Sequence, residues 1–79
     1  MVNKEMVIRK IVLDMVTLSI IDFKSGNEKA LIVLERALPD FLGLKKSRRI
    51  MEIIRRNIMM DTVDIIDEVD KELKRCEEQ

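Results

Sequence analysis

The sequence predicts an all-α fold, a small three-helix chain with a long C-terminal helix that forms a homodimeric helical bundle. Three observations support this fold class. Aliphatic residues recur at helical spacing along most of the chain. Helix-breaking residues occur only at Gly26, Pro39 and Gly43. The 79 residues are enough for one domain, residues 1–79, but a domain of this size has a small core and often needs a partner subunit.

The composition restricts the possible function classes. Hydrophobic residues make up 47% and charged residues 38% of the chain, with a formal net charge of zero, which is typical of a folded protein with a thermophile-like balance of few amides and many ions. There is no histidine, and Cys76 is the single cysteine, so an intrachain disulfide and a histidine-dependent catalytic triad are excluded and a zinc site is strongly disfavoured. We therefore expect no enzyme activity, no cofactor and no metal.

The N-terminal segment shows no targeting signal, because charged residues interrupt residues 1–10. No apolar run approaches the length that spans a membrane, and a single cysteine suits a reducing compartment. The sequence therefore predicts a cytoplasmic protein with no membrane partner.

The first predicted helix covers residues 3–22. Its polar residues form one stripe and the other positions are almost all aliphatic, so this helix should contact neighbours on several sides. The β-branched residues between 16 and 23 also suit a strand, and the pattern leaves open whether residues 16–23 are helix or strand.

The second predicted helix covers residues 26–38. Ser25 and Glu28 have the spacing of a capping box, which would start the helix at this point. Pro39 disfavours helical geometry at Leu38, so the helix should stop or bend there. A short hydrophobic turn follows, in which Gly43 is expected to adopt a positive φ.

The third predicted helix covers residues 46–76, a stretch without glycine or proline. At 1.5 Å per residue it would reach about 45 Å, and neither of the shorter helices could cover it from end to end. Part of its apolar stripe, which ends at Cys76, should therefore meet another molecule.

The charges of this helix are divided between its two halves. Residues 45–56 contain six cations and one anion, and residues 61–72 contain six anions and one cation. This order is opposite to the one that a helix dipole favours. An antiparallel copy of the same helix would compensate, because each basic half would then face an acidic half under two-fold symmetry.

The predicted dimer interface combines the apolar stripe with these charges. Its residues are Ile54, Ile58, Met59, Val63, Ile66, Val69, Leu73, Arg55, Arg56, Asp64 and Asp67.

A second possible surface opens the third helix. Lys45, Lys46, Arg48 and Arg49 form a possible nucleic-acid contact, because helix N-termini already favour anions. The zero net charge, the absence of aromatic residues in this segment and the absence of asparagine and glutamine in the first turns disfavour it.

An acidic set on the same helix has 3–4–4 spacing and consists of Asp61, Asp64, Glu68 and Glu72. Such carboxylates can bind Mg²⁺ when a second helix supplies more, but no partner motif exists elsewhere, so a solvated acidic face is expected. The sequence therefore predicts a non-enzymatic protein–protein interaction or regulatory adaptor module acting as a homodimer. The alternative is a small nucleic-acid-binding regulator that uses the basic segment Lys45–Arg56.

Overall fold

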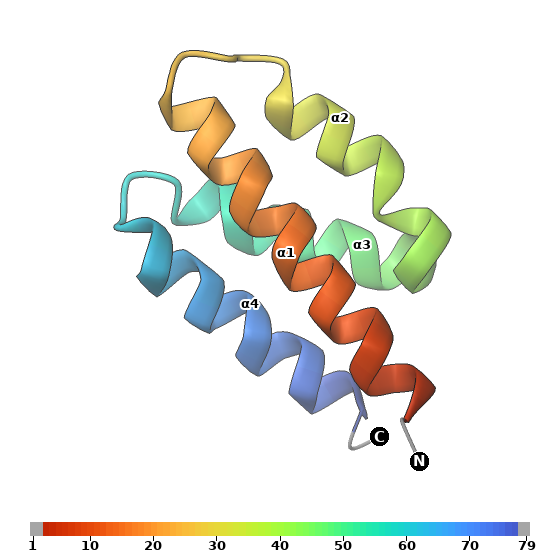
Figure 1. Ribbon diagram of the computed structural model, residues 1–79. Coiled ribbons are helices and arrows are strands. Elements are labelled where there is room, and N and C mark those ends of the chain that lie inside the picture. Colours follow the sequence, from red (N-terminus) through yellow and green to blue (C-terminus); the bar gives the residue numbers. More distant parts are fainter. Residues whose placement is uncertain (1–2, 78–79) are drawn as a thin grey trace.

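The computed structural model describes residues 3–77, with side chains described through residue 75. Four helices make up almost all of this part of the chain (Figure 1). They are α1 (Lys4–Lys24), α2 (Ala30–Ala37), α3 (Pro39–Arg56) and α4 (Thr62–Glu77). No strand occurs in residues 3–77. The all-α prediction is thus confirmed, and residues 16–23 are helical.

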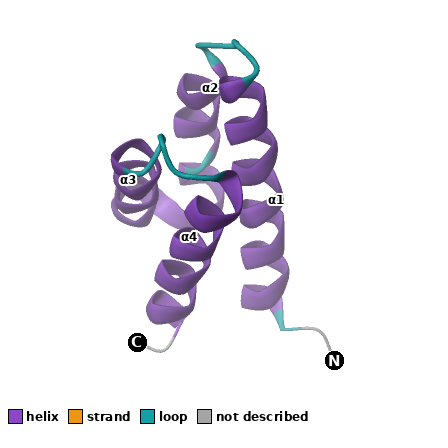
Figure 2. Cartoon of the chain, turned by 90° about the vertical axis from the view of Figure 1, so that its left-hand side faces the viewer, coloured by secondary structure: helices purple, strands orange, loops and turns teal. Residues whose placement is uncertain are grey.

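The helices form a closed ring of neighbours. Helix α1 packs against α2 on one side and against α4 on the other, and α3 also packs against α2 and α4. Helices α1 and α3 therefore lie on opposite sides of the molecule, as Figure 1 and Figure 2 show from two directions. None of the described helices is long and apolar enough to cross a membrane.

Each helix contributes a row of aliphatic side chains to one core. Residues three or four positions apart lie on the same face of a helix, so these rows point inward together. The core residues are Val12, Val16 and Ile20 of α1, Leu31 and Leu34 of α2, Leu38, then Ile50, Met51 and Ile54 of α3, and Ile65, Val69 and Leu73 of α4.

The connection between α1 and α2 differs from the predicted one. Ser25 Oγ donates a hydrogen bond back to the carbonyl of Ile21 at 2.8 Å, so Ser25 closes α1 rather than opening α2. Asn27 Oδ1 accepts instead from the N–H of Lys29 at 3.1 Å. The predicted capping box is therefore wrong, and α2 begins four residues later than expected, at Ala30.

The end of α2 follows the prediction, but α3 begins at Pro39 and not at residue 46, so the segment predicted as a hydrophobic turn belongs to α3. Helix α2 ends at Ala37, Leu38 is fully buried, and Pro39 occupies the first position of α3. Gly43 has a φ of 80° and kinks α3 shortly after its start. The predicted positive φ of Gly43 is therefore confirmed. Glycine suits this position because other residues rarely adopt this conformation.

The continuous helix predicted for residues 46–76 is wrong, because a turn at residues 57–61 divides it into α3 and α4. Asn57 ends α3, and its Nδ2 donates to the carbonyl of Ile53 at 2.8 Å. The N–H of Met60 then donates to the carbonyl of Asn57 at 2.9 Å. The N–H of Asn57 donates to the same carbonyl at 3.1 Å, so the asparagine backbone and side chain together close the last turn of α3.

Helix α4 restarts directly after Asp61. The carbonyl of Asp61 accepts from the N–H groups of Asp64 and Ile65 at 3.0 and 3.1 Å. The ammonium group of Lys24, at the end of α1, donates to the carbonyl of Met60 and ties the turn to α1. The chain therefore reverses here without glycine or proline. For this reason the positions of glycine and proline in the sequence did not predict this turn.

The division also reduces the conflict with the helix dipole at the two helix ends that it creates. Arg55 and Arg56 now lie in the last turn of α3, and Asp64 lies in the first turn of α4. Lys74 and Arg75 occupy the last turn of α4. Each group therefore lies at the helix end that stabilises its charge.

Two neighbouring isoleucines test this packing. Replacing the fully buried Ile20 by alanine should lower the free energy of unfolding by about 2–5 kcal/mol, because it leaves a cavity in the core. Replacing Ile21, which is 50% exposed, should cost less than about 1 kcal/mol. Urea unfolding followed by circular dichroism measures both at a dilution that excludes association, and equal losses would contradict the described orientation of α1.

Candidate interaction surfaces

The apolar part of the predicted dimer interface is divided between the core and the surface. Ile54, Val69 and Leu73 lie in the core of the chain itself and are at most 5% exposed. Ile58 and Ile66 are half-buried against that core. These five side chains are therefore largely occupied by contacts within one chain. The side chain of Cys76, the predicted end of the stripe, lies outside the described part of the structure.

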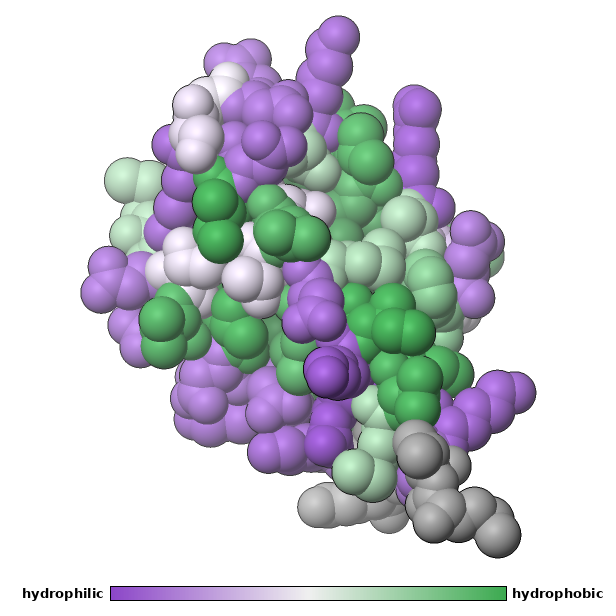
Figure 3. Space-filling model, viewed as in Figure 1, coloured by the Kyte–Doolittle hydropathy of each residue, from purple (hydrophilic) through white to green (hydrophobic). Residues whose placement is uncertain are grey.

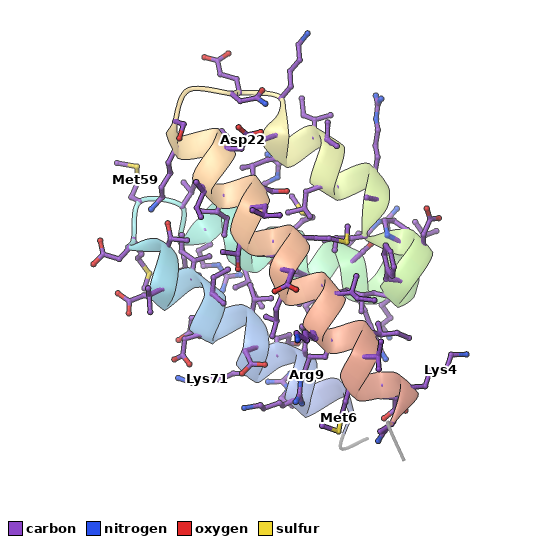
Figure 4. The ribbon with its side chains drawn as sticks, viewed as in Figure 1. Lys4, Met6, Arg9, Asp22, Met59 and Lys71 are labelled. Carbon is purple, nitrogen blue, oxygen red and sulfur yellow. The ribbon has the colours of Figure 1, made fainter. Side chains whose placement is uncertain are left out.

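Met59 and Val63 remain on the surface, near the turn between α3 and α4. Their side chains are 95% and 78% exposed, and Figure 4 shows Met59 extending from this turn. The structure does not bring them together with Ile54, Val69 or Leu73 on one surface.

The charged members of the predicted interface mostly have partners within the chain. Arg55 lies 3.5 Å from Glu35 of α2. Arg56 lies 3.0 Å from Glu52, and Asp67 lies 3.2 Å from Lys71.

The remaining charged member, Asp64, is exposed in the first turn of α4.

The ion pair of Asp67 with Lys71 changes the titration of the lysine. The hydrogen bond and the charge of Asp67, together with the charge of Glu68, raise the pKa of Lys71 above its ordinary value.

The predicted antiparallel meeting of basic and acidic segments occurs inside one chain. Nε of Arg49 on α3 lies 2.7 Å from Oε1 of Glu72 on α4, and Nε of Arg75 lies 3.9 Å from Oε2 of the same residue. Glu72 is only 9% exposed, and Arg49 approaches outside hydrogen-bonding angles, so charge attraction holds the pair. On the other side of α4, Arg9 of α1 lies 3.8 Å from Asp70.

The four predicted nucleic-acid contacts are all exposed on α3. Lys45, Arg48 and Arg49 line an open groove of about 710 Å³ between α3 and α4, together with Arg56 and Arg75. Lys46 points elsewhere and lines a smaller hollow beside α1. Glu52, Glu68 and Glu72 also line the groove, so the basic surface is partly neutralised.

A further surface, which the sequence did not single out, covers the outer side of α1. Val7, Ile11, Leu18 and Ile21 are 42%, 38%, 69% and 50% exposed, and exposed Asp14 lies among them. We call these five residues the α1 face. Figure 3, viewed like Figure 1, shows apolar side chains on this side of the molecule.

The signal for the α1 face was present but obscured. Its spacing of 4, 3, 4 and 3 residues places all five residues on one side of a helix. Aliphatic residues surround most of α1, however, and the sequence pattern could not show which part of this wide arc the other helices would cover.

The described residues do not provide a metal site, since no group of three or more histidine, cysteine, aspartate or glutamate side chains is placed to hold an ion. Within the acidic set of α4, Glu72 is turned toward Arg49.

Comparison with protein-family models, with curated proteins and with solved structures found no match to this chain.

Neutralising Glu72 tests the internal charge pairing. The substitution Glu72→Gln keeps the shape of the side chain but leaves Arg49 and Arg75 without their carboxylate, so the free energy of unfolding should fall by about 1–2 kcal/mol. Glu68→Gln, at a half-exposed position, is the matched control and should change it by less than about 0.5 kcal/mol. Similar effects of the two substitutions in chemical denaturation would show that Glu72 has no special role.

Proposed function

We propose that this chain is a non-enzymatic protein–protein interaction module, or regulatory adaptor, whose contact surface is the α1 face. The observation that supports this proposal most directly is the row of four aliphatic side chains exposed on one side of a single helix. Isolated exposed apolar residues are common in proteins, but several on one side of a single helix are more typical of an interaction site.

The energetics favour a covered α1 face. Burying one aliphatic side chain completely contributes about 1.5–3 kcal/mol, so covering four that are roughly half exposed adds several kcal/mol to an association. The helix that carries them is held in place from both sides by α2 and α4. A partner would therefore dock on a preformed surface with little reorganisation.

The homodimer predicted from the sequence stays a proposal, with a different contact surface. Most of the apolar side chains expected to pair between copies pack in or against the core of each chain, and Arg55, Arg56 and Asp67 have other partners within the chain. The α1 face is the largest aliphatic row that the described helices leave exposed, so it replaces the C-terminal segment in the proposal.

A photo-crosslinking amino acid at position 18 tests whether the α1 face is used. In cells that produce the protein, we expect illumination to give a covalent adduct of the chain with itself or with another protein, because Leu18 is the most exposed residue of the α1 face. The same amino acid in place of Glu28, which is exposed in the α1–α2 turn, is the matched control and should give no such adduct. Equal crosslinking at both positions, or none at position 18, would contradict the proposal.

Binding to nucleic acid is a second candidate function. Its specific support is that Lys45 and Arg48 are exposed beside the groove and make no ion pair within the described part of the structure. Arg49, Arg55 and Arg56 already have carboxylate partners, which leaves few cations for phosphate groups.

Salt dependence tests this second function. If the chain makes two or three phosphate contacts, its affinity for duplex DNA or RNA should fall about 10- to 40-fold between 50 and 200 mM salt. The double substitution K45E/R48E should abolish binding, whereas Lys29→Glu, a single charge reversal at the start of α2, should leave most of it. Fluorescence anisotropy measures both, and absence of binding at the lower salt concentration would end this candidate.

A further inference from the structure

We propose that the occupant of the α1 face is α1 of a second copy of the chain, docked antiparallel across a two-fold axis. This inference rests on the proposed function and adds the identity, orientation and register of the partner. It depends on the order of apolar and charged residues along α1 and on the position of α1 in the fold.

The α1 face has the residue spacing of a coiled-coil contact. Val7, Ile11, Asp14, Leu18 and Ile21 alternate in steps of four and three, which keeps them on the side of the helix that meets a partner helix. Asp14 is the one polar residue in the row. A single polar residue in such a row commonly fixes the register and orientation of the pair.

The charges on and beside the α1 face change sign along the helix. Lys4 and Lys10 lie in the first half of α1, Asp14 lies at its middle and Asp22 near its end, and all four are exposed. Figure 4 shows Lys4 and Asp22 at opposite ends of the helix. At about 100° per residue, Lys4 and Asp22 border the row on one side and Lys10 borders it on the other. The net charge of this set is zero.

An antiparallel copy brings unlike charges together at two positions along α1, near Lys4 and near Lys10. When Val7 of one copy faces Leu18 of the second, Lys10 lies within one residue of the level of Asp14 of the second copy. Lys4 then lies within one residue of the level of its Asp22, and two-fold symmetry repeats each pair. Asp14 would otherwise be covered by apolar side chains without a cation, which is costly. Lys10 of the second copy supplies that cation.

A parallel pair fails on the same residues. It would place Asp14 level with Asp14 and Lys10 level with Lys10, so no cation would lie at the level of either carboxylate. An unrelated partner would need its own matching order of two cations and two anions, whereas a second copy carries that order already.

The fold leaves room for this contact. In Figure 2 α1 forms one edge of the molecule, with α3 on the opposite side. Helices α2 and α4 flank α1 without covering the α1 face, since its residues remain exposed. Two copies can therefore meet along α1 while the basic groove of each stays outside the contact.

A charge swap tests the orientation in solution. Sedimentation equilibrium of the full chain should show a monomer–dimer equilibrium, and the dissociation constant should rise at least about 10-fold in D14K and in K10D, because each places like charges together. The double variant K10D/D14K should return to within about 3-fold of the unchanged chain. E28K, a charge reversal away from α1, is the control and should have no effect. Circular dichroism verifies that each variant is folded.

Thiol crosslinking tests the register independently, in a chain carrying C76S. A mixture of V7C and L18C chains should form a crosslinked dimer with a short bismaleimide reagent, because the two positions face each other. Neither variant should crosslink alone, since Val7 of one copy would lie about 16 Å along the axis from Val7 of the second.

The outcomes separate this inference from the proposed function. A chain that stays monomeric at 100 µM, a double variant that does not recover, or V7C chains that crosslink to each other would overturn the antiparallel pair. The proposed function would still stand if position 18 crosslinks to a different protein in cells, and it would fail as well if position 18 gives no adduct.

Discussion

The turn at residues 57–61 is the constraint on which the rest of the structure depends. It reverses the chain so that Ile65, Val69 and Leu73 return to the core beside Ile50 and Ile54. Without this turn one side of α1 and α3 would lose its cover, because α4 packs against both. The hydrogen bonds at the turn are few and local, so most of its stability comes from the apolar side chains that the reversal buries.

The same reversal determines the electrostatics. In one long helix, the basic and acidic segments would oppose the dipole and require an external partner. Folded back, they lie side by side, and Arg49 meets Glu72 within one chain. Charge division along the sequence therefore does not by itself indicate dimerisation here. The surface that we propose as the partner contact is instead the α1 face, on the side of the molecule opposite to α3.

The two candidate surfaces are compatible because they lie on different helices. The α1 face is apolar with balanced charges, whereas the groove beside α3 is lined by five cations and three carboxylates. Pairing along α1 would leave both grooves open in a dimer, directed away from the contact. An interaction module built in this way could combine self-association with a second, charge-dependent contact on each copy.

The sequence by itself determined the helical class, the approximate ends of the first two helices, the positive φ of Gly43 and most of the aliphatic rows that form the core. These follow from local chemistry, since spacing and breaker residues act within a few positions. Only the tertiary structure decided that residues 46–76 divide into two helices and which side of α1 stays exposed. Asn57 and Asp61 are weak local signals whose effect depends on the core contacts that the reversal creates, and those contacts join residues far apart in the chain.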